Sequence, residues 1–218
     1  MFKILVLISG NGTTLQHLID NINNSSNNSI SNNIKIVGVI SNKEDAFGLT
    51  RAKDNNISTY CFPFKKNQQS RESYDTQLTN LISNIDYDLI VCAGWMHILN
   101  SQFLTKHPKI INIHPALPNS YKGMYCIKKT FEGFKKGEVE QGGVMVHWVI
   151  PDVDAGEVIS QYIVQLKGTL FESATYEYYE QEIKKIEKST FFFSFFLSFF
   201  LFFVFFCFWI DLFIYYYY

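Results

Sequence analysis

The sequence is poor in cysteine and in net charge, and each scarcity excludes a class of function. Its four cysteines, among 218 residues, include no CxxC pair, so neither a zinc site nor a disulfide framework is indicated. Free thiols instead favour a reducing, cytoplasmic compartment. The 19 basic and 20 acidic residues give a net charge of −1, which argues against nucleic acid or a membrane surface as a partner. A chain of this length accommodates one domain, or one domain with an appendage.

Charge is also missing from residues 191–210, FFFSFFLSFFLFFVFFCFWI. Twenty uncharged residues, apolar except for two serines, are long enough for a membrane span, although this run lacks the glycine, alanine and mixed aliphatic content of ordinary spans. Three interpretations stay open: a tail anchor with lysines on its cytosolic side, an aggregation-prone low-complexity tail, or a translated non-coding stretch. We favour the last on composition. The sequence therefore divides into a predicted functional domain, residues 1–188, and a Phe/Tyr-rich tail, residues 189–218.

Within the domain, short apolar runs alternate with helical patterns. Residues 21–33, NINNSSNNSISNN, interrupt this alternation and are predicted to be a flexible loop. Alternating strands and helices predict an α/β fold with an open, mostly parallel, doubly wound sheet flanked by helices. Such sheets bind ligands at the carboxyl ends of their strands, which directs attention to the residues after Ile8, Ala93 and Ile113. The predicted strands cover residues 3–9, 34–40, 58–62, 89–93, 110–113, 144–150 and 158–164, and the predicted helices cover 13–22, 46–55 and 71–85.

A glycine-containing turn, Ser9-Gly10-Asn11-Gly12-Thr13-Thr14, follows the first predicted strand and opens a helix. Backbone N–H groups at a helix N-terminus attract anions, and glycine lets the backbone approach them closely. The turn therefore suits a phosphate group. A plain strand-to-helix turn capped by threonine fits the same residues equally well.

Two polar pairs follow later strands. Asn112 and His114 are two residues apart in a strand and therefore project to the same side, where an amide and an imidazole can bind a carbonyl oxygen and move a proton. His147 and Asp154 lie seven residues apart, and a carboxylate near His114 would orient its ring and favour its protonated form. Taken singly, the first pair is more typical of a satisfied core histidine with a neighbouring asparagine. Aspartates such as Asp152 and Asp154 usually cap a surface turn.

An apolar segment after the strand at 89–93, Gly94-Trp95-Met96-His97-Ile98-Leu99, can wall a pocket for a flat heterocycle. We interpret His97 as a partly exposed loop histidine without a catalytic role. A phosphate turn, an apolar wall and polar pairs, all placed after strands, together indicate one ligand-binding edge.

Four segments resemble the phosphoribosylglycinamide formyltransferase (GAR transformylase) family in order and spacing: KILVLISGNGTTLQ, IVCAGWMHIL, INIHPALP and VHWVIPDVDAGEVI. The resemblance covers about residues 2–166. Its Asn-x-His-Pro and His-x(6)-Asp-x-Gly motifs are typical of folate-dependent formyltransferases, and SGNG-x-x-L is typical of the GAR-acting branch. The resemblance implies a Rossmann-like fold and transfer of the formyl group of 10-formyltetrahydrofolate to glycinamide ribonucleotide in purine synthesis.

The resemblance also implies roles for particular residues. Asn112, His114 and Asp154 become the catalytic residues, with Asp154 raising the pKa of His114 and positioning a water that relays protons. The residues implied to bind the substrate's phosphate and ribose are Gly12, Thr13, Thr14 and Glu182. Neither a metal nor a nucleic-acid partner is implied, and a membrane partner only if residues 191–210 are an anchor. The implied folate site comprises Arg71, Met96, His97, Ile98, Leu99, Asn112, Ile150, Pro151, Asp152, Val153 and Asp154.

Some residues depart from the family pattern. Thr13-Thr14 replaces a common Ser-Asn, His97 stands where arginine is common, and residues 119–123 form an atypical loop. After Gly168 the match degrades, and we expect the closing helix of the family to be missing. Methionyl-tRNA formyltransferase and formyltetrahydrofolate hydrolase remain alternatives, although neither the basic domain of the first nor the regulatory domain of the second is expected here. A membrane-tethered, inactive relative is the remaining alternative.

Overall fold

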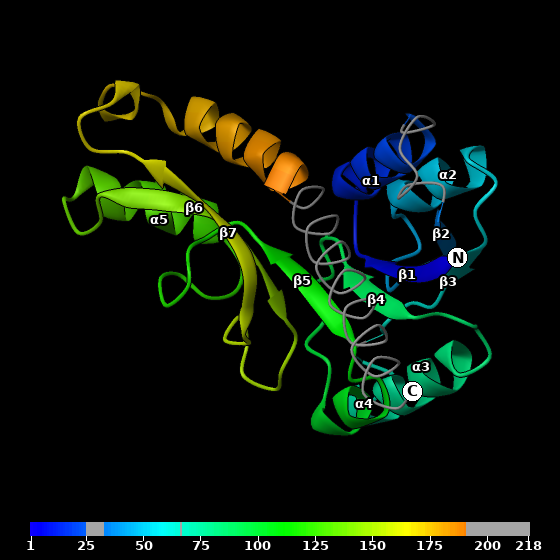
Figure 1. The fold of residues 1–218 in the computed structure, drawn as a ribbon. Helices are drawn as coiled ribbons and strands as arrows, with labels where there is room; N and C mark the ends of the chain where they lie inside the picture. Colours follow the sequence, from blue (N-terminus) through cyan, green and yellow to red (C-terminus); the bar gives the residue numbers. More distant parts are fainter. Residues whose placement is uncertain (25–32, 66, 191–218) are drawn as a thin grey trace, which may run out of the picture.

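The structure is a computed structural model that describes residues 1–24, 33–65 and 67–190. Seven strands form one sheet in the order β3-β2-β1-β4-β5-β6-β7, with helices on both faces (Figure 1). The strands are β1 (Phe2–Ile8), β2 (Ile34–Ser41), β3 (Thr59–Cys61), β4 (Leu89–Cys92), β5 (Ile110–His114), β6 (Gln141–Trp148) and β7 (Val158–Gln165). The helices are α1 (Thr13–Asn24), α2 (Phe47–Asp54), α3 (Arg71–Ile82), α4 (Ser101–Lys106), α5 (Cys126–Lys135), a 3-10 turn (Leu170–Glu172) and a helix over residues 176–190.

The sheet is parallel over its first five positions. Strands β3, β2, β1, β4 and β5 pair in parallel, whereas β6 runs antiparallel to both β5 and β7. The chain proceeds outward from β1 in one direction to β3, and then returns to place β4 on the other side of β1. The predicted open, mostly parallel sheet is confirmed. Its order reverses between β1 and β4, where ligands bind in folds of this kind.

Strand alternation divides the core into two layers. Ile4, Val6 and Ile8 of β1 face the cluster covered by α1, α2 and the helix over 176–190, whereas Leu5 and Leu7 face the cluster covered by α3 and α4. Side chains of successive strand residues point to opposite faces, so a strand buried on both sides is apolar throughout. This is why KILVLI lacks the polar alternation of a half-exposed strand.

The helices depart from the predictions in three places. Helix α1 continues through Asn24, so residues 21–24 are not part of a loop, and residues 25–32 lie outside the described part of the chain. Helix α3 ends at Ile82, three residues before the predicted end. The sequence patterns also gave no prediction for α4 and α5, which the structure contains.

The closing helix that we expect to be missing would lie where the Phe-rich run begins, outside the described residues, so this expectation stays a prediction. Residues 176–190 form a helix that buries Tyr179 and Ile183 in the core. Across the residues that the structure describes, no helix is both long and apolar enough to cross a membrane. The apolar run at 191–210, for which an anchor was one interpretation, lies outside those residues.

Candidate active site

Asn112, His114 and Asp154 converge at the carboxyl end of β5. Asn112 and His114 project from the same side of this strand, and Asp154 arrives from the loop between β6 and β7. One carboxylate oxygen of Asp154 accepts from Asn112 Nδ2 at 3.3 Å, and the other lies 3.3 Å from His114 Nδ1. Asp154 therefore bridges the two strand residues, as the spacing of the motifs predicted.

His147 holds the amide of Asn112 in place. The antiparallel pairing of β5 and β6 sets the two residues opposite each other, with Asn112 Nδ2 3.2 Å from His147 Nε2. The other ring nitrogen, Nδ1, lies 2.9 Å from the carbonyl oxygen of Trp148, which can only accept. Nδ1 of His147 consequently carries a hydrogen. Its Nε2 faces both the amide of Asn112 and, at 3.5 Å, Oδ1 of Asp154, so His147 is a positioning residue for the two.

The loop after His114 organises both His114 and Asp154 through its backbone. The carbonyl oxygen of Tyr121 lies 2.8 Å from His114 Nε2, and the N–H of Gly123 donates to Asp154 Oδ2 at 2.7 Å. Gly123 has φ +71°, a conformation that glycine adopts without strain, and Asp154 itself has φ +51°. The segment that departs most from the family pattern therefore supplies two contacts to the site. Sequence reasoning missed them because they come from backbone atoms; the only signal was the glycine.

The electrostatics of the site differ from the expectation for His114. Burial lowers the pKa of His114 more than the nearby carboxylate of Asp154 and the bond to Tyr121 raise it, and His147 lowers it further. Asp154 does favour the charged ring, as predicted, but the net shift is downward because desolvation penalises the cation more strongly. Burial alone would raise the pKa of Asp154, yet the hydrogen bond to His147, the charge of His114 and the N–H of Gly123 together lower it.

The turn after β1 packs closely against α2. Gly12 has φ +70°, and a Cβ there would lie 2.6 Å from Cα of Gly48 in α2, so no other residue fits without displacement. Thr13 is exposed at the start of α1, whereas the Oγ1 of the buried Thr14 lies 3.3 Å from Oε1 of Glu187. The turn therefore presents the N-terminus of α1 with one free and one engaged threonine.

Arg51 of α2 holds the tip of this turn. Its Nε donates to the carbonyl oxygen of Asn11 at 2.8 Å, and its Nη2 donates to Asn11 Oδ1 at 3.2 Å. A guanidinium forks over two acceptors in a fixed geometry, which orders the loop and adds positive charge beside the helix N-terminus.

The apolar wall follows β4, and its successive side chains point alternately outward and inward. Met96 and Ile98 are 59% and 50% exposed, whereas His97 and Leu99 are buried. The interpretation of His97 as a partly exposed loop residue is therefore wrong: the ring is enclosed, with Nε2 2.6 Å from Oδ1 of Asp75. The outward pair leaves an apolar surface of the kind that accepts a flat heterocycle.

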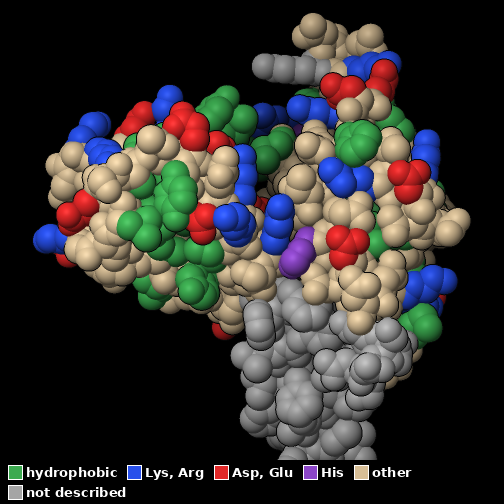
Figure 2. All heavy atoms as spheres, turned by 90° about the horizontal axis from the view of Figure 1, so that it is seen from above, with side chains coloured by type: hydrophobic (Ala, Val, Ile, Leu, Met, Phe, Trp, Pro, Cys, Tyr) green, Lys and Arg blue, Asp and Glu red, His purple; other side chains and the backbone are tan. Residues whose placement is uncertain are grey.

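The loop over residues 150–154 supplies the other predicted folate contacts. Ile150, Pro151 and Asp152 are exposed and Val153 is half-buried, while Asp152 forms a 3.0 Å ion pair with Lys122. Arg71 is exposed at the first residue of α3. The surface of the molecule is hollowed between two lobes, and basic and histidine side chains gather along the hollow (Figure 2).

Comparison with known proteins gives the same answer along nearly the whole described chain. The formyl transferase family model matches residues 2–193. A phosphoribosylglycinamide formyltransferase from Dictyostelium discoideum is 41% identical over 202 residues, which are 86% of this chain and 96% of the relative. The corresponding Schizosaccharomyces pombe protein is 38% identical over 177 residues, covering 77% and 84%. The chain belongs to the phosphoribosylglycinamide formyltransferase family.

A solved structure supports the assignment in three dimensions. The crystal structure of phosphoribosylglycinamide formyltransferase from Campylobacter jejuni superimposes with a TM-score of 0.79 and 32% identity, over 91% of this chain and 97% of that one. The GAR transformylase from Symbiobacterium toebii gives a TM-score of 0.75 at 30% identity, over 88% and 84%. The family fold is therefore present throughout the domain, including the antiparallel strands that carry the Asp154 loop.

Within this family fold, the predicted ribose contact, Glu182, is not the glutamate nearest the phosphate turn. Its side chain pairs with Lys185 on the same helix at 2.6 Å. Glu187, five residues later, reaches Thr14 instead, and its burial raises its pKa. Five residues rotate a helix by roughly 140°, so the two glutamates point to different sides. The periodicity of Tyr179 and Ile183 does not separate the two glutamates, because both are half-buried and flank the inward side of this helix.

Proposed function

We propose that this protein transfers the formyl group of 10-formyltetrahydrofolate to the primary amine of glycinamide ribonucleotide in de novo purine synthesis. One observation carries the proposal: a single carboxylate, Asp154, joins Asn112 and His114 at the strand end in a chain whose relatives bear that activity in their names. An amide donor, an imidazole and a carboxylate are what an acyl transfer between two nitrogens requires.

The two substrates would enter from opposite sides of this centre. The phosphate of glycinamide ribonucleotide suits the turn at Gly12, Thr13 and Thr14, where the N–H groups and dipole of α1 favour an anion. The pterin of the folate suits the exposed pair Met96 and Ile98 together with the loop over residues 150–154. Holding both reactants in one hollow replaces a bimolecular encounter by an oriented one.

The chemistry follows from the positions of the donors. The amine attacks the formyl carbon, a bond to this nitrogen forms, and negative charge develops on the formyl oxygen. One N–H of Asn112 would exchange its long bond to Asp154 for the oxyanion, since such contacts tighten only in the reacting complex. Neutral His114 takes the proton that the amine releases, and Asp154 stabilises the resulting cation. The bond to N10 of the folate then breaks, and that nitrogen takes up the proton.

The ribose contact is better assigned to Glu187 than to Glu182. Glu187 lies against the phosphate turn through Thr14, on the inward side of its helix. A carboxyl group there would accept hydrogen bonds from ribose hydroxyls on the far side of the phosphate. Cys61, Cys92 and Cys126 are free thiols, which supports the expectation of a reducing, cytoplasmic compartment.

The experiment is an acceptor comparison with the full-length protein. Labelled 10-formyltetrahydrofolate is offered with glycinamide ribonucleotide, with methionyl-tRNA, or with no acceptor. The proposal expects formyl-glycinamide ribonucleotide and tetrahydrofolate in equal amounts. Free formate should form much more slowly than the formylated product. Formylated tRNA or acceptor-independent formate would identify one of the other two folate enzymes and refute the proposal.

A further inference from the structure

We propose that Asp75 and His97 form a positioning clamp for the apolar wall, residues 94–99, which the proposed function assigns to the formyl-folate. Asp75 lies in the middle of α3, away from the catalytic residues, and holds the segment from which Met96 and Ile98 project. The clamp fixes the direction of these two side chains and of the backbone between them. The inference rests on the proposed function only in the identity of the ligand.

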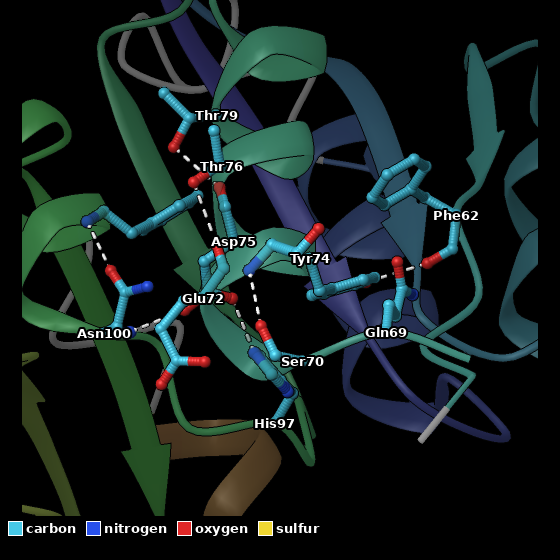
Figure 3. Close-up of polar contacts among 12 residues, drawn as sticks. Phe62, Gln69, Ser70, Glu72, Tyr74, Asp75, Thr76, Thr79, His97 and Asn100 are labelled. Atoms are coloured by element: carbon cyan, nitrogen blue, oxygen red, sulfur yellow. Dashed lines mark hydrogen bonds and ion pairs between the residues drawn. The ribbon is translucent and has the colours of Figure 1, made fainter. Parts of the chain in front are cut away.

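Both carboxylate oxygens of Asp75 are used on this one segment (Figure 3). Oδ1 lies 2.6 Å from His97 Nε2, and Oδ2 accepts from the backbone N–H of Asn100 at 2.7 Å. Since a carboxylate only accepts, Nε2 of His97 carries the hydrogen. The side chains of Asp75 and His97 are 1% and 3% exposed. In this dry setting the two bonds are strong, and losing either donor leaves a buried oxygen unsatisfied.

Aromatic rings fix the orientation of the imidazole. The ring centroid of His97 lies 4.9 Å from that of Tyr74, 5.0 Å from Phe64 and 6.1 Å from Trp95. Tyr74 is fully buried and donates its hydroxyl to the carbonyl oxygen of Phe62 at 2.8 Å (Figure 3). The imidazole therefore has one arrangement in which it both fits its enclosure and reaches Asp75.

The other end of the segment is tied to the phosphate turn. Ser9 Oγ accepts from the N–H of Met96 at 2.7 Å, and the N–H of Ser9 donates to the carbonyl oxygen of Gly94 at 3.0 Å. Anchors at both ends and the inward direction of His97 force Met96 and Ile98 outward. The buried contacts of the clamp thus determine which way the side chains of the apolar wall point.

His107, a second buried histidine, provides the structural comparison. The hydroxyl of Tyr87 lies 2.5 Å from His107 Nδ1, and these residues precede β4 and follow α4. They therefore lie toward the opposite edge of the sheet from the ligand-binding ends. Breaking either pair should lower the stability of the protein. Only breaking the Asp75–His97 pair should also weaken binding of the formyl donor to the apolar wall.

The test compares replacements that differ in one hydrogen-bond donor. Glutamine places an amide N–H where histidine has Nε2, whereas leucine and phenylalanine supply none. For His97→Leu and His97→Phe we expect KM for 10-formyltetrahydrofolate to rise at least about tenfold, because a charge-assisted bond is lost. KM for glycinamide ribonucleotide and kcat should stay within about twofold, and hydrogen exchange of residues 94–100 should accelerate. His97→Gln should keep both KM values within about threefold of wild type.

Three results would overturn the clamp. They are an unchanged KM for the formyl donor in both donorless variants, an equal rise of both KM values, or a His97→Gln protein as impaired as His97→Leu. Tyr87→Phe is the matched control and should lower thermal stability without raising either KM. Wild-type protein that transfers no formyl group to glycinamide ribonucleotide would instead refute the proposed function, which keeps the two failures distinct.

Discussion

At the residue scale, His114 lies between opposing influences on its proton. Both ring nitrogens face acceptors, the carbonyl oxygen of Tyr121 and the carboxylate of Asp154, so the hydrogen-bond partners favour the cation. Burial favours the neutral ring and prevails, so the pKa falls below its ordinary value of 6.5. A lowered pKa favours the neutral ring, the form that the proposed general base requires.

Replacing Asp154 by asparagine should move the pH profile in one direction. Asp154 raises the pKa of His114, so its removal lowers that pKa further. In the proposed mechanism the acid limb of kcat/KM marks where neutral His114 becomes protonated in the free enzyme, and burial lowers that pKa from the ordinary histidine value. In Asp154→Asn this limb should shift to lower pH while the plateau rate falls. A limb that stays in place, or moves to higher pH, would remove Asp154 from the mechanism.

Two glutamates on one helix allow a matched test of the ribose contact. Glu187→Gln should raise KM for glycinamide ribonucleotide about tenfold, the effect of losing one good hydrogen bond to a ligand, without changing KM for the formyl donor. Glu182→Gln makes the same chemical change at another half-buried position of the helix, where the partner is Lys185. Initial rates with each substrate varied in turn should leave it near wild type. The reverse pattern would restore Glu182 as the ribose contact.

The sequence predicted those candidate site residues that contribute side chains and that lie within a short motif. Asn112 and His114 follow from strand alternation, and the motif around Asp154 follows from the family resemblance. The roles of Tyr121 and Gly123 could not be predicted, because they act through the backbone. Burial of His97 was also missed, since its partner Asp75 is 22 residues away and only the packing of α3 brings them together.

At the element scale, the carboxyl ends of the parallel strands gather the site. The turn proposed for the phosphate follows β1, the apolar wall proposed for the folate follows β4, and the proposed catalytic pair ends β5. Continuous apolar runs identified these strands because both faces of the sheet are covered. The short helix α4, six residues capped by Asn100, has too little periodicity to be found in the sequence. The helix over residues 176–190 was overlooked because the chain was expected to depart from its family there.

That helix should contribute strongly to stability through Tyr179. This side chain is 1% exposed and packs against Phe131 and Phe171, with ring centroids 5.5 and 5.7 Å away. Tyr179→Ala should lower the free energy of unfolding by about 3–5 kcal/mol, the usual cost of deleting a buried aromatic ring. Tyr178→Ala, at a neighbouring position that is 41% exposed, should cost about 1 kcal/mol or less. Urea unfolding measures both, and equal losses would show that this helix does not close the core.

At the scale of the whole molecule, side-chain contacts join elements distant in sequence. The turn after β1 and the helix over residues 176–190 meet at Thr14 and Glu187, while β5 and the loop before β7 meet at Asp154. In the proposed function Asn112 and Asp154 belong to both the catalytic set and the folate site, whereas His114 belongs to the catalytic set alone. A change at His114 should therefore leave the two proposed ligand-binding surfaces intact, and this separation is the central claim.

Single-turnover formyl transfer by His114→Ala tests that claim most directly. Wild-type and variant protein are saturated with glycinamide ribonucleotide and labelled 10-formyltetrahydrofolate, and the dissociation constants of both are measured by calorimetry under conditions without turnover. We predict binding within about threefold of wild type and a transfer rate at least about a hundredfold lower, typical of losing a general acid–base group. A near-normal transfer rate with both ligands bound would contradict the account.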